Sequence, residues 1–463
     1  MTGNKIIFIG WDCAAPALVF DKLLGGLPNV RKAMETGLWG RLRSCDPPIT
    51  VPAWQVMFTG RGPGELGVYG FRSRKGNSYG DFSIVTSKSI KNEAIWDFLG
   101  KKGMNSIVSG VPPSYPVRPL KGSMIACFIT PDFKKDSVYP ESLKAEIIRI
   151  TGEYPFDVVF RTEDKKAIAK ECFEMTEKHF KVFEYLLSKN DWKLAAHVEI
   201  GLDRVQHGFW KYFDSGHHLH EPGSEYAGVI PEYYRLLDGW LGRIMEKADE
   251  DTLIIVASDH GAKRMKGAFC VNQWLEKEGY LRFNSRPSAG QKLESADVDW
   301  TKTKFWGWGG YYTRLFLNIK GREEQGIIEP ENTGREIRGI KEKILNFTGP
   351  DGRKWNNRVY EPHEMYENPQ GDKPDLMVYW DDLYWRSAGT VGHASMFLPE
   401  NDTGPDDAVH DYEGIFLAWK KGRQKGSGKE LEGLKITDVF PTMAEYLGLG
   451  LSGYAGKAIK PSI

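Results

Sequence analysis

The chain has 463 residues, of which 41% are hydrophobic and 27% are charged, so we expect a sizeable folded core rather than disorder. Lysine plus arginine and aspartate plus glutamate each number 62, which gives a formal net charge of zero. This balance disfavours a dedicated nucleic-acid-binding protein, because such proteins usually carry an excess of basic residues.

The amino-terminal run MTGNKIIFIGWD contains an apolar stretch that is too short for a signal peptide, and no small-residue cleavage site follows it. No run of the sequence approaches the length of a membrane span. The five cysteines are scattered without CxxC spacing, which is typical of reduced thiols rather than of a disulfide framework or a zinc knuckle. We therefore expect a cytoplasmic protein.

Short apolar runs that end abruptly in Gly, Asp or Ser alternate with helical patterns along the chain. Such continuous apolar runs fit strands that are buried on both faces of a parallel sheet. The alternation predicts a doubly wound α/β fold, whose ligands gather at the carboxyl ends of the strands. We expect strands at 5–12, 105–110, 193–203, 252–261, 314–321, 375–380 and 414–422, and helices at 93–103, 231–248 and 437–450, the last with Thr437 as N-cap.

Two regions interrupt this alternation. The segment at about 130–190 is charged and mostly helical in pattern, and the segment at about 263–312 is rich in Trp, Gly and polar residues. We expect a single catalytic domain over 1–463 in which both segments are insertions over the sheet edge, forming a cap. The stripe FWGWGGYY at 305–312 is a candidate specificity wall for a base or sugar, although aromatic-rich runs more often serve packing.

Acidic and histidine residues stand where predicted strands end or begin. A single histidine is more often a satisfied structural residue than a ligand. However, strand ends of one parallel sheet converge on one edge, and mixed carboxylate and imidazole ligands suit zinc and similar divalent ions. The candidate ligands are Asp12, Asp203, His207, Asp259, His260 and His410.

The stretch CDPPITVPAW, at 45–54, sets Thr50 between prolines. The ordinary interpretation is a rigid surface corner. Alternatively, the prolines immobilise Thr50 as a nucleophile, and with Thr50 the seven candidate ligands suffice for two ions. A two-metal site clamps the attacking and leaving oxygens of an in-line phosphoryl displacement. A threonine nucleophile needs nearby metal ions, because its alkoxide is accessible at neutral pH only when a metal lowers the pKa of the hydroxyl.

The motifs GWD, PPITVPAW, GLDRVQHGFW, VASDHG and DAVHDYEGIFLAW occur in an order that resembles the type I phosphodiesterase/nucleotide pyrophosphatase family of the alkaline phosphatase superfamily. The resemblance runs from Asp12 to about Leu449. It implies a three-layer α/β/α sandwich with a mostly parallel central sheet. It also implies a covalent phosphothreonine that a metal-activated water hydrolyses.

The same resemblance implies how the metal ligands are shared. One divalent ion would be held by Asp203, His207 and His410. The other would be held by Asp12, Asp259 and His260, with Thr50 bridging as the nucleophile. We expect both ions to be zinc, with manganese or iron as alternatives.

The chain departs from the family after the nucleophile. It reads ELGVYGFRSRKG, with Leu66 where relatives commonly have histidine, so the donor to the phosphoryl oxygen is not given by the resemblance. The candidates are the Thr50 backbone N–H, Tyr69, Lys263 and Arg264. A solvated loop is an equally good interpretation of the last two.

We predict hydrolysis of phosphodiesters or nucleotide pyrophosphates, with a small-molecule phosphate ester or nucleotide as the partner. The neighbours of Thr50 in sequence are apolar, so diesters should be preferred over dianionic monoesters unless Arg61 reaches back to the site. The alternatives are a phosphomonoesterase or phosphotransferase on the same site, and a metal-binding protein that has lost catalysis. The seven filled ligand positions argue against such a loss.

Overall fold

The computed structural model describes residues 3–189 and 191–460, and its largest element is a ten-stranded sheet in the order β20-β2-β19-β9-β1-β8-β5-β6-β7, with β21 beside β2. The five strands from β9 to β6 run parallel, whereas β19 and β7 are antiparallel to their neighbours β9 and β6. The strands are β1 (Lys5–Trp11), β2 (Leu38–Arg43), β5 (Ser106–Ser109), β6 (Gly122–Ile125), β7 (Val138–Tyr139), β8 (Leu194–Glu199), β9 (Thr252–Ala257), β19 (Glu413–Lys420), β20 (Lys429–Glu430) and β21 (Leu434–Lys435).

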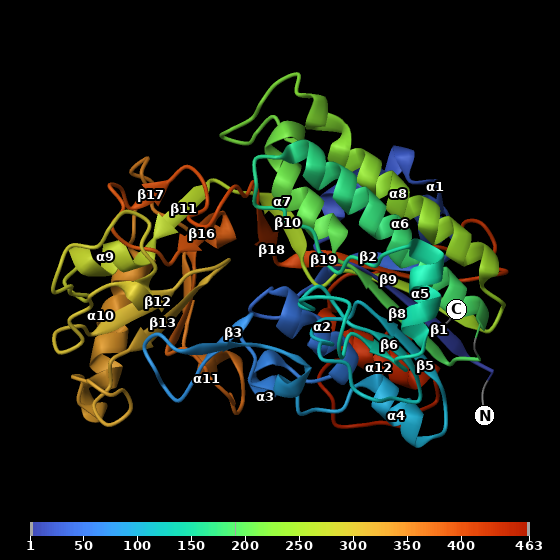
Figure 1. Ribbon diagram of the computed structural model, residues 1–463, viewed down its shortest axis with the longest axis horizontal. Helices are drawn as coiled ribbons and strands as arrows, with labels where there is room; N and C mark the ends of the chain where they lie inside the picture. The colour runs from blue at the N-terminus through green and yellow to red at the C-terminus, as the bar shows by residue number, and fades with distance from the viewer. Residues whose placement is uncertain (1–2, 190, 461–463) are drawn as a thin grey trace.

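Helices cover both faces of this sheet (Figure 1). Successive side chains of a strand point to opposite faces, and β1 accordingly sends Ile7 and Ile9 into one apolar cluster and Ile6 and Phe8 into the other. The first cluster contains side chains of α1 (Pro28–Thr36), α5 (Leu143–Thr151), α6 (Lys165–Lys189), α7 (Gly201–Phe213) and α8 (Val229–Lys247). The second contains those of α2 (Thr50–Thr59), α3 (Pro63–Leu66), α4 (Ile95–Lys101) and α12 (Val439–Tyr446). The predicted α/β/α class is confirmed.

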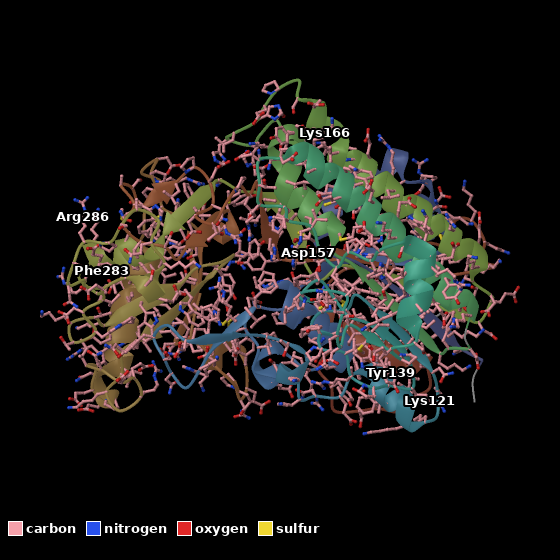
Figure 2. The ribbon with its side chains drawn as sticks, in the orientation of Figure 1. Lys121, Tyr139, Asp157, Lys166, Phe283 and Arg286 are labelled. Atoms are coloured by element: carbon pink, nitrogen blue, oxygen red, sulfur yellow. The ribbon has the colours of Figure 1, made fainter. Side chains whose placement is uncertain are left out.

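A second lobe lies beside the main sheet, with its own apolar cluster (Figure 1). Figure 2 shows Phe283 and Arg286 of this lobe at the opposite end of the molecule from Lys121 and Tyr139. Its four-stranded sheet has the order β12-β13-β15-β14, and a smaller one the order β16-β11-β17. Its elements are β11 (Gly267–Cys270), α9 (Val271–Lys277), β12 (Phe305–Trp308), β13 (Thr313–Leu317), α10 (Thr333–Leu345), β14 (Arg358–Tyr360), α11 (Pro362–Met365), β15 (Leu376–Tyr379), β16 (Trp385–Ala388) and β17 (Phe397–Leu398).

Two short ribbons complete the strands. One pairs β3 (Arg72–Arg74) with β4 (Phe82–Ile84). The other pairs β10 (Gly261–Arg264) with β18 (Ala408–Asp411). The second ribbon brings His410 opposite Ala262, next to the end of β9.

Three expectations differ from the structure. The strands predicted at 314–321 and 375–380 exist as β13 and β15, but they pair antiparallel in the second lobe, where they are buried on both faces as parallel strands usually are. The charged helix α6 lies on a face of the main sheet, because one side of it is apolar and buried. The N-cap of α12 is Asp438 rather than Thr437, since residues 436–438 form a 3-10 turn and the Asp438 carboxylate accepts a hydrogen bond from the Lys435 N–H.

The segment at 263–312 supplies β11, α9 and β12 to the second lobe, which continues beyond it. The division of the chain into one domain with two caps stays a prediction. Among the described residues, no helix combines the length and the apolar character that crossing a membrane requires.

Candidate active site

Thr50 is the first residue of α2, and Ile49 before it has an extended backbone. Thr50 is only 3% exposed, so the interpretation of CDPPITVPAW as a surface corner is wrong. Pro52 fits because it lies in the first turn, where a missing N–H leaves no helical hydrogen bond unmade. Neither the Thr50 nor the Val51 N–H finds an acceptor among the described residues. The helix therefore presents a hydroxyl and two free N–H groups at its positive end.

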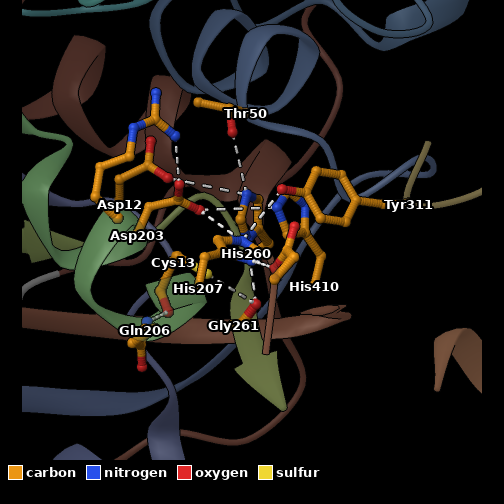
Figure 3. A network of polar contacts seen from close by, with 12 residues as sticks. Asp12, Cys13, Thr50, Asp203, Gln206, His207, His260, Gly261, Tyr311 and His410 are labelled. Atoms are coloured by element: carbon orange, nitrogen blue, oxygen red, sulfur yellow. Dashed lines mark hydrogen bonds and ion pairs between the residues drawn. The ribbon is translucent and has the colours of Figure 1, made fainter. Parts of the chain in front are cut away.

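One group of candidate ligands comes from α7 and β18 (Figure 3). Asp203 and His207 lie one helical turn apart, and the His207 Nε2 is 3.2 Å from the Asp203 Oδ1. The His410 Nε2 is 3.8 Å from the same oxygen. These three side chains, together with Cys13, have ligand atoms close enough to hold one metal ion.

The other group follows the carboxyl ends of β1 and β9. The His260 Nε2 is 3.1 Å from the Asp259 Oδ2 and 4.0 Å from the Asp12 Oδ1. The Thr50 Oγ1 lies 3.3 Å from the same nitrogen. The rings of His260 and His410 stack with their centroids 3.6 Å apart and so join the two groups. The structure thus brings all seven predicted residues together, and all of them are buried.

Each histidine of the cluster is oriented through its Nδ1–H. A carbonyl or an ionised carboxylate can only accept, so each ring donates from Nδ1 and turns its Nε2 toward the cluster. This is the arrangement by which proteins orient metal-binding imidazoles. The acceptors are Asp406 Oδ1 for His207 at 2.6 Å, Pro48 O for His410 at 2.8 Å and Gly261 O for His260 at 3.1 Å.

Each carboxylate of the cluster likewise has one oxygen that is hydrogen-bonded to the protein and one that is not. One oxygen of each is held by the protein, through Trp54 Nε1 to Asp12 Oδ2 at 2.7 Å, Arg204 to Asp203 Oδ2 at 2.6 Å and the Cys13 N–H to Asp259 Oδ1 at 3.1 Å. The remaining oxygens and the His410 Nε2 are buried without a hydrogen-bond partner. Unpaired buried polar atoms are costly, and divalent ions would satisfy them all. The residues therefore fit metal ions.

The electrostatics indicate a shortage of positive charge. Burial raises the pKa of the Asp12 carboxyl well above its ordinary value, and the charges of Asp259 and Asp203 raise it further. Burial opposes ionisation of Asp203 too, but His207 and Arg204 outweigh it and hold that pKa well below its ordinary value. Burial and the neighbouring His260 keep the pKa of His410 well below normal, so this imidazole is neutral, as metal binding requires.

Several site residues were missed by sequence reasoning. Asp406, which orients His207, belongs to an Asp–Asp pair that precedes His410 in a motif, and this pair was the available signal. Tyr311 stacks on His410 at 3.4 Å between ring centroids, and its hydroxyl lies 3.2 Å from the His207 Nε2. Tyr311 belongs to the aromatic stripe FWGWGGYY at 305–312, where it follows two glycines. No sequence signal pointed to Cys13.

The three candidate donors outside the cluster have partners elsewhere. The Tyr69 hydroxyl donates to the Gln370 carbonyl at 2.8 Å. Lys263 donates to the Asp382 carbonyl at 2.7 Å, and Arg264 lies 3.7 Å from an Asp214 oxygen. Within the part of the chain that the structure describes, none of the three contacts the cluster by a hydrogen bond or ion pair, so their role in substrate binding stays a prediction.

A separate buried cluster consists of His179, His197 and Glu199. The His179 Nδ1 is 3.0 Å from the Glu199 Oε2, and its Nε2 is 2.7 Å from the Pro155 carbonyl. Both ring nitrogens of His179 are therefore occupied, whereas the His197 Nε2 is buried without a hydrogen-bond partner, 3.4 Å from the Glu199 Oε2.

The α/β/α fold and the buried acidic and histidine cluster at the strand ends agree with a metal-dependent hydrolase. More closely, the chain belongs to the family "Type I phosphodiesterase / nucleotide pyrophosphatase", whose family model matches residues 6–412. The family is metal-dependent, and the protein is a hydrolase of the phosphodiesterase/nucleotide pyrophosphatase type. The proposed family membership is thereby confirmed. No curated protein sequence matches the chain.

Solved structures support the same fold. Human ectonucleotide pyrophosphatase/phosphodiesterase 5 is 13% identical with a TM-score of 0.57, over 98% of this chain and 97% of that one. An inactive threonine-to-alanine variant of the murine protein in complex with AMP is 15% identical, with the same TM-score and coverage. Phosphonoacetate hydrolase from Sinorhizobium meliloti 1021, in complex with phosphonoformate, is 15% identical with a TM-score of 0.61, over 96% of each chain.

Proposed function

We propose that the protein cleaves phosphodiesters or nucleotide pyrophosphates at a two-metal site, with Thr50 as the nucleophile. One observation carries the proposal: three imidazole Nε2 atoms converge with three carboxylates and the Thr50 Oγ1, while every Nδ1–H is committed to a fixed acceptor. This arrangement leaves the three Nε2 atoms and one oxygen of each carboxylate facing the centre of the cluster.

The geometry suggests how the ligands divide. Asp203, His207 and His410 would hold one ion, and Asp12, Asp259, His260 and Thr50 the other. Mixed nitrogen and oxygen donors favour zinc, with manganese or iron as alternatives. When bound, the ions would lower the pKa of the Thr50 hydroxyl and stabilise charge on the phosphoryl oxygens.

The residues of the chain account for the remaining steps. The Thr50 Oγ1 attacks phosphorus while the bond to the leaving oxygen breaks, which gives a phosphothreonine. A water molecule then cleaves that intermediate and restores the hydroxyl. The free N–H groups of Thr50 and Val51, at the positive end of α2, are placed to donate to a phosphoryl oxygen.

The surroundings of Thr50 favour a diester. A monoester brings a second negative charge to the reacting phosphoryl group, and a fixed cation would be needed to balance it. Arg61 instead pairs with Glu65 at 3.2 Å, and Lys263 pairs with Asp411 at 3.1 Å. Of the cations considered from the sequence, none within the described ranges contacts Thr50.

One comparison structure agrees with this proposal. The inactive murine variant, in which a threonine is replaced by alanine, agrees with a threonine nucleophile, and its bound AMP agrees with a nucleotide substrate. At this identity the likeness shows the fold alone, so the roles of residues here rest on the geometry.

The test is hydrolysis of bis(4-nitrophenyl) phosphate and 4-nitrophenyl phosphate by the zinc-reconstituted protein and its Thr50 variants. Thr50→Ala should lose several orders of magnitude in turnover, while Thr50→Ser should retain part of it. Thermal unfolding controls for the fold. An alanine variant that is nearly as active as the parent would show that water, not Thr50, is the nucleophile. A protein that cleaves only the monoester would favour the phosphomonoesterase alternative.

A further inference from the structure

A cavity of about 200 Å³ lies in the second lobe, beside the active site. A cavity needs only about 10–15 Å³ of such volume to hold a single water, so this cavity has room for a larger group. Five of its lining residues are basic and two are acidic, although the chain as a whole has no net charge. We call this cavity the basic pocket, and its charged residues are Arg72, Arg161, Lys292, Arg314, Arg386, Glu294 and Asp402.

Arg314, in β13, is the least balanced of these cations. It is only 7% exposed, and its guanidinium lies 4.7 Å from the centre of the Trp308 ring. One nitrogen donates to the Arg72 carbonyl at 2.7 Å, but no carboxylate within the described residues forms an ion pair with it. Buried arginines are almost always paired, because a buried charge is costly without a counter-ion. The pocket therefore holds a buried cation that has no ion-pair partner among the described residues.

Two further buried donors lack acceptors. The Nε of Arg386 and the Nε1 of Trp308 are buried without a hydrogen-bond partner, and both residues line the basic pocket. The lining acid Asp402 binds elsewhere, because its carboxylate accepts hydrogen bonds from the Thr390 N–H and hydroxyl at 3.1 and 2.8 Å. Unsatisfied donors and an unpaired guanidinium together indicate an anionic ligand with several acceptor oxygens.

The wall of the pocket touches the active site on one side. Arg161 and Arg386 both pair with Asp406, at 3.0 and 3.2 Å, and Asp406 orients His207. Arg386 also lies 4.3 Å from the centre of the Tyr311 ring, whose hydroxyl points at His207 (Figure 3). The basic pocket thus adjoins the group formed by Asp203, His207 and His410.

Thr50 stands beside His260, in the other ligand group. With ions bound, one ligand group would stabilise the attacking oxygen and the other would stabilise the leaving oxygen of an in-line displacement. With Thr50 attacking from the His260 side, the leaving oxygen departs on the His207 side, where the basic pocket lies. The pocket is therefore placed to receive the leaving part of a substrate.

We propose that the basic pocket binds an anionic group, carboxylate or phosphoryl, on the leaving part of the substrate. The substrates are then diesters or diphosphates whose leaving group carries its own negative charge, which guanidinium groups recognise through paired hydrogen bonds. This inference rests on the function proposed above, and it adds the class of leaving group.

Three methyl aryl phosphate diesters test it. Their leaving phenols carry a para CH₂–CONH₂, CH₂–COO⁻ or CH₂–PO₃²⁻ group, so charge changes while the ester is constant. Release of the phenol is measured by chromatography for the zinc-reconstituted parent, Arg314→Met and Lys292→Met. Lys292 is exposed and forms no ion pair among the described residues, so we expect Lys292→Met to fold as the parent does. Arg335→Met is the matched control, since Arg335 is an exposed arginine of the same lobe outside the pocket.

The parent should favour a charged diester over the amide by at least about tenfold in kcat/KM, and Arg314→Met should remove that preference while changing the amide by less than about threefold. Lys292→Met should reduce the preference in part, and Arg335→Met should not. A preference for the carboxylate or for the phosphonate identifies which anion is bound. Equal rates for all three diesters in the parent, or equal loss for all three in Arg314→Met, would overturn the inference.

If the parent cleaves none of the diesters, the proposed function fails, and the pocket is then judged by binding alone. Calorimetric titration with 4-hydroxybenzylphosphonate, the charged phenol, should show weaker binding to Arg314→Met and Lys292→Met than to the parent and Arg335→Met. Equal affinity in all four proteins would overturn the inference on this readout too.

Discussion

Asp406 offers the sharpest test of how the protein prepares its metal site. Its Oδ1 accepts the His207 Nδ1–H at 2.6 Å, and its Oδ2 accepts from Arg161 and Arg386 at 3.0 and 3.2 Å. The side chain is fully buried, and the positive groups around it hold the pKa of its carboxyl below the ordinary value in spite of burial. Asp406→Asn keeps the shape and an acceptor oxygen for His207 but removes the negative charge.

The loss should be substantial. Removing the partner that orients a metal-binding histidine typically costs 10- to 100-fold in metal affinity, which corresponds to about 1.4–2.7 kcal/mol. The substitution also leaves Arg161 and Arg386 without their shared counter-charge next to the ligands, which further disfavours a divalent cation. We therefore expect a loss of zinc affinity toward the upper end of this range.

The assay is zinc affinity by competition with a chromogenic chelator, for the parent, Asp406→Asn and Asp402→Asn. Asp402 lies in the same loop but binds Thr390 rather than His207, so its substitution controls for a general change in charge. Thermal unfolding checks that each variant is folded. If Asp406→Asn binds zinc within about twofold of the Asp402→Asn control, the carboxylate does not prepare His207 for metal, and the reasoning from hydrogen-bond geometry is refuted.

Three other predictions follow from the structure. Elemental analysis of the reconstituted protein should give two divalent ions per chain, and a maximum of one would remove the two-metal mechanism. Steady-state kinetics at one pH and metal load should favour diesters over matched monoesters by at least about tenfold in kcat/KM, near 1.4 kcal/mol, because Thr50 lacks a neighbouring cation; a monoester preference would contradict this. Burial, opposed in part by Lys165 and Lys211, raises the pKa of Asp407 to about 7 from 3.8. A raised carboxyl pKa means that the folded state loses stability as pH rises from about 4 to 7. Asp407→Asn should therefore stabilise the protein against urea unfolding at pH 8, and much less at pH 4. An equal stabilisation at both pH values would refute the assignment.

Five strands of the main sheet, β1, β5, β8, β9 and β19, were predictable because each carries a continuous apolar run, whereas β2, β6, β7, β20 and β21 were missed. β1, β8 and β9 are such runs, and they fix the positions of Asp12, Asp203 and the Asp259–His260 pair. One physical rule, that carboxyl ends of parallel strands share an edge, then sufficed to place these side chains together.

The rest depended mainly on contacts between residues that lie far apart in the sequence. Asp406 orients His207 from 199 positions away in the sequence, and Tyr311 reaches His410 from the second lobe. Apolar runs such as β13 look alike in parallel and antiparallel sheets when both faces are covered, so their placement in the second lobe could not be read from composition. The prolines around Thr50 suggested a loop, whereas Pro52 is tolerated in the first turn of a helix.

The acceptors of the three imidazoles differ in kind. His260 and His410 donate to main-chain carbonyls, which every residue type possesses, so their orientation depends on the path of the backbone rather than on the side chain of the acceptor residue. His207 depends on one replaceable side chain. A substitution at position 406 can consequently remove the acceptor of His207 alone, while His260 and His410 keep theirs.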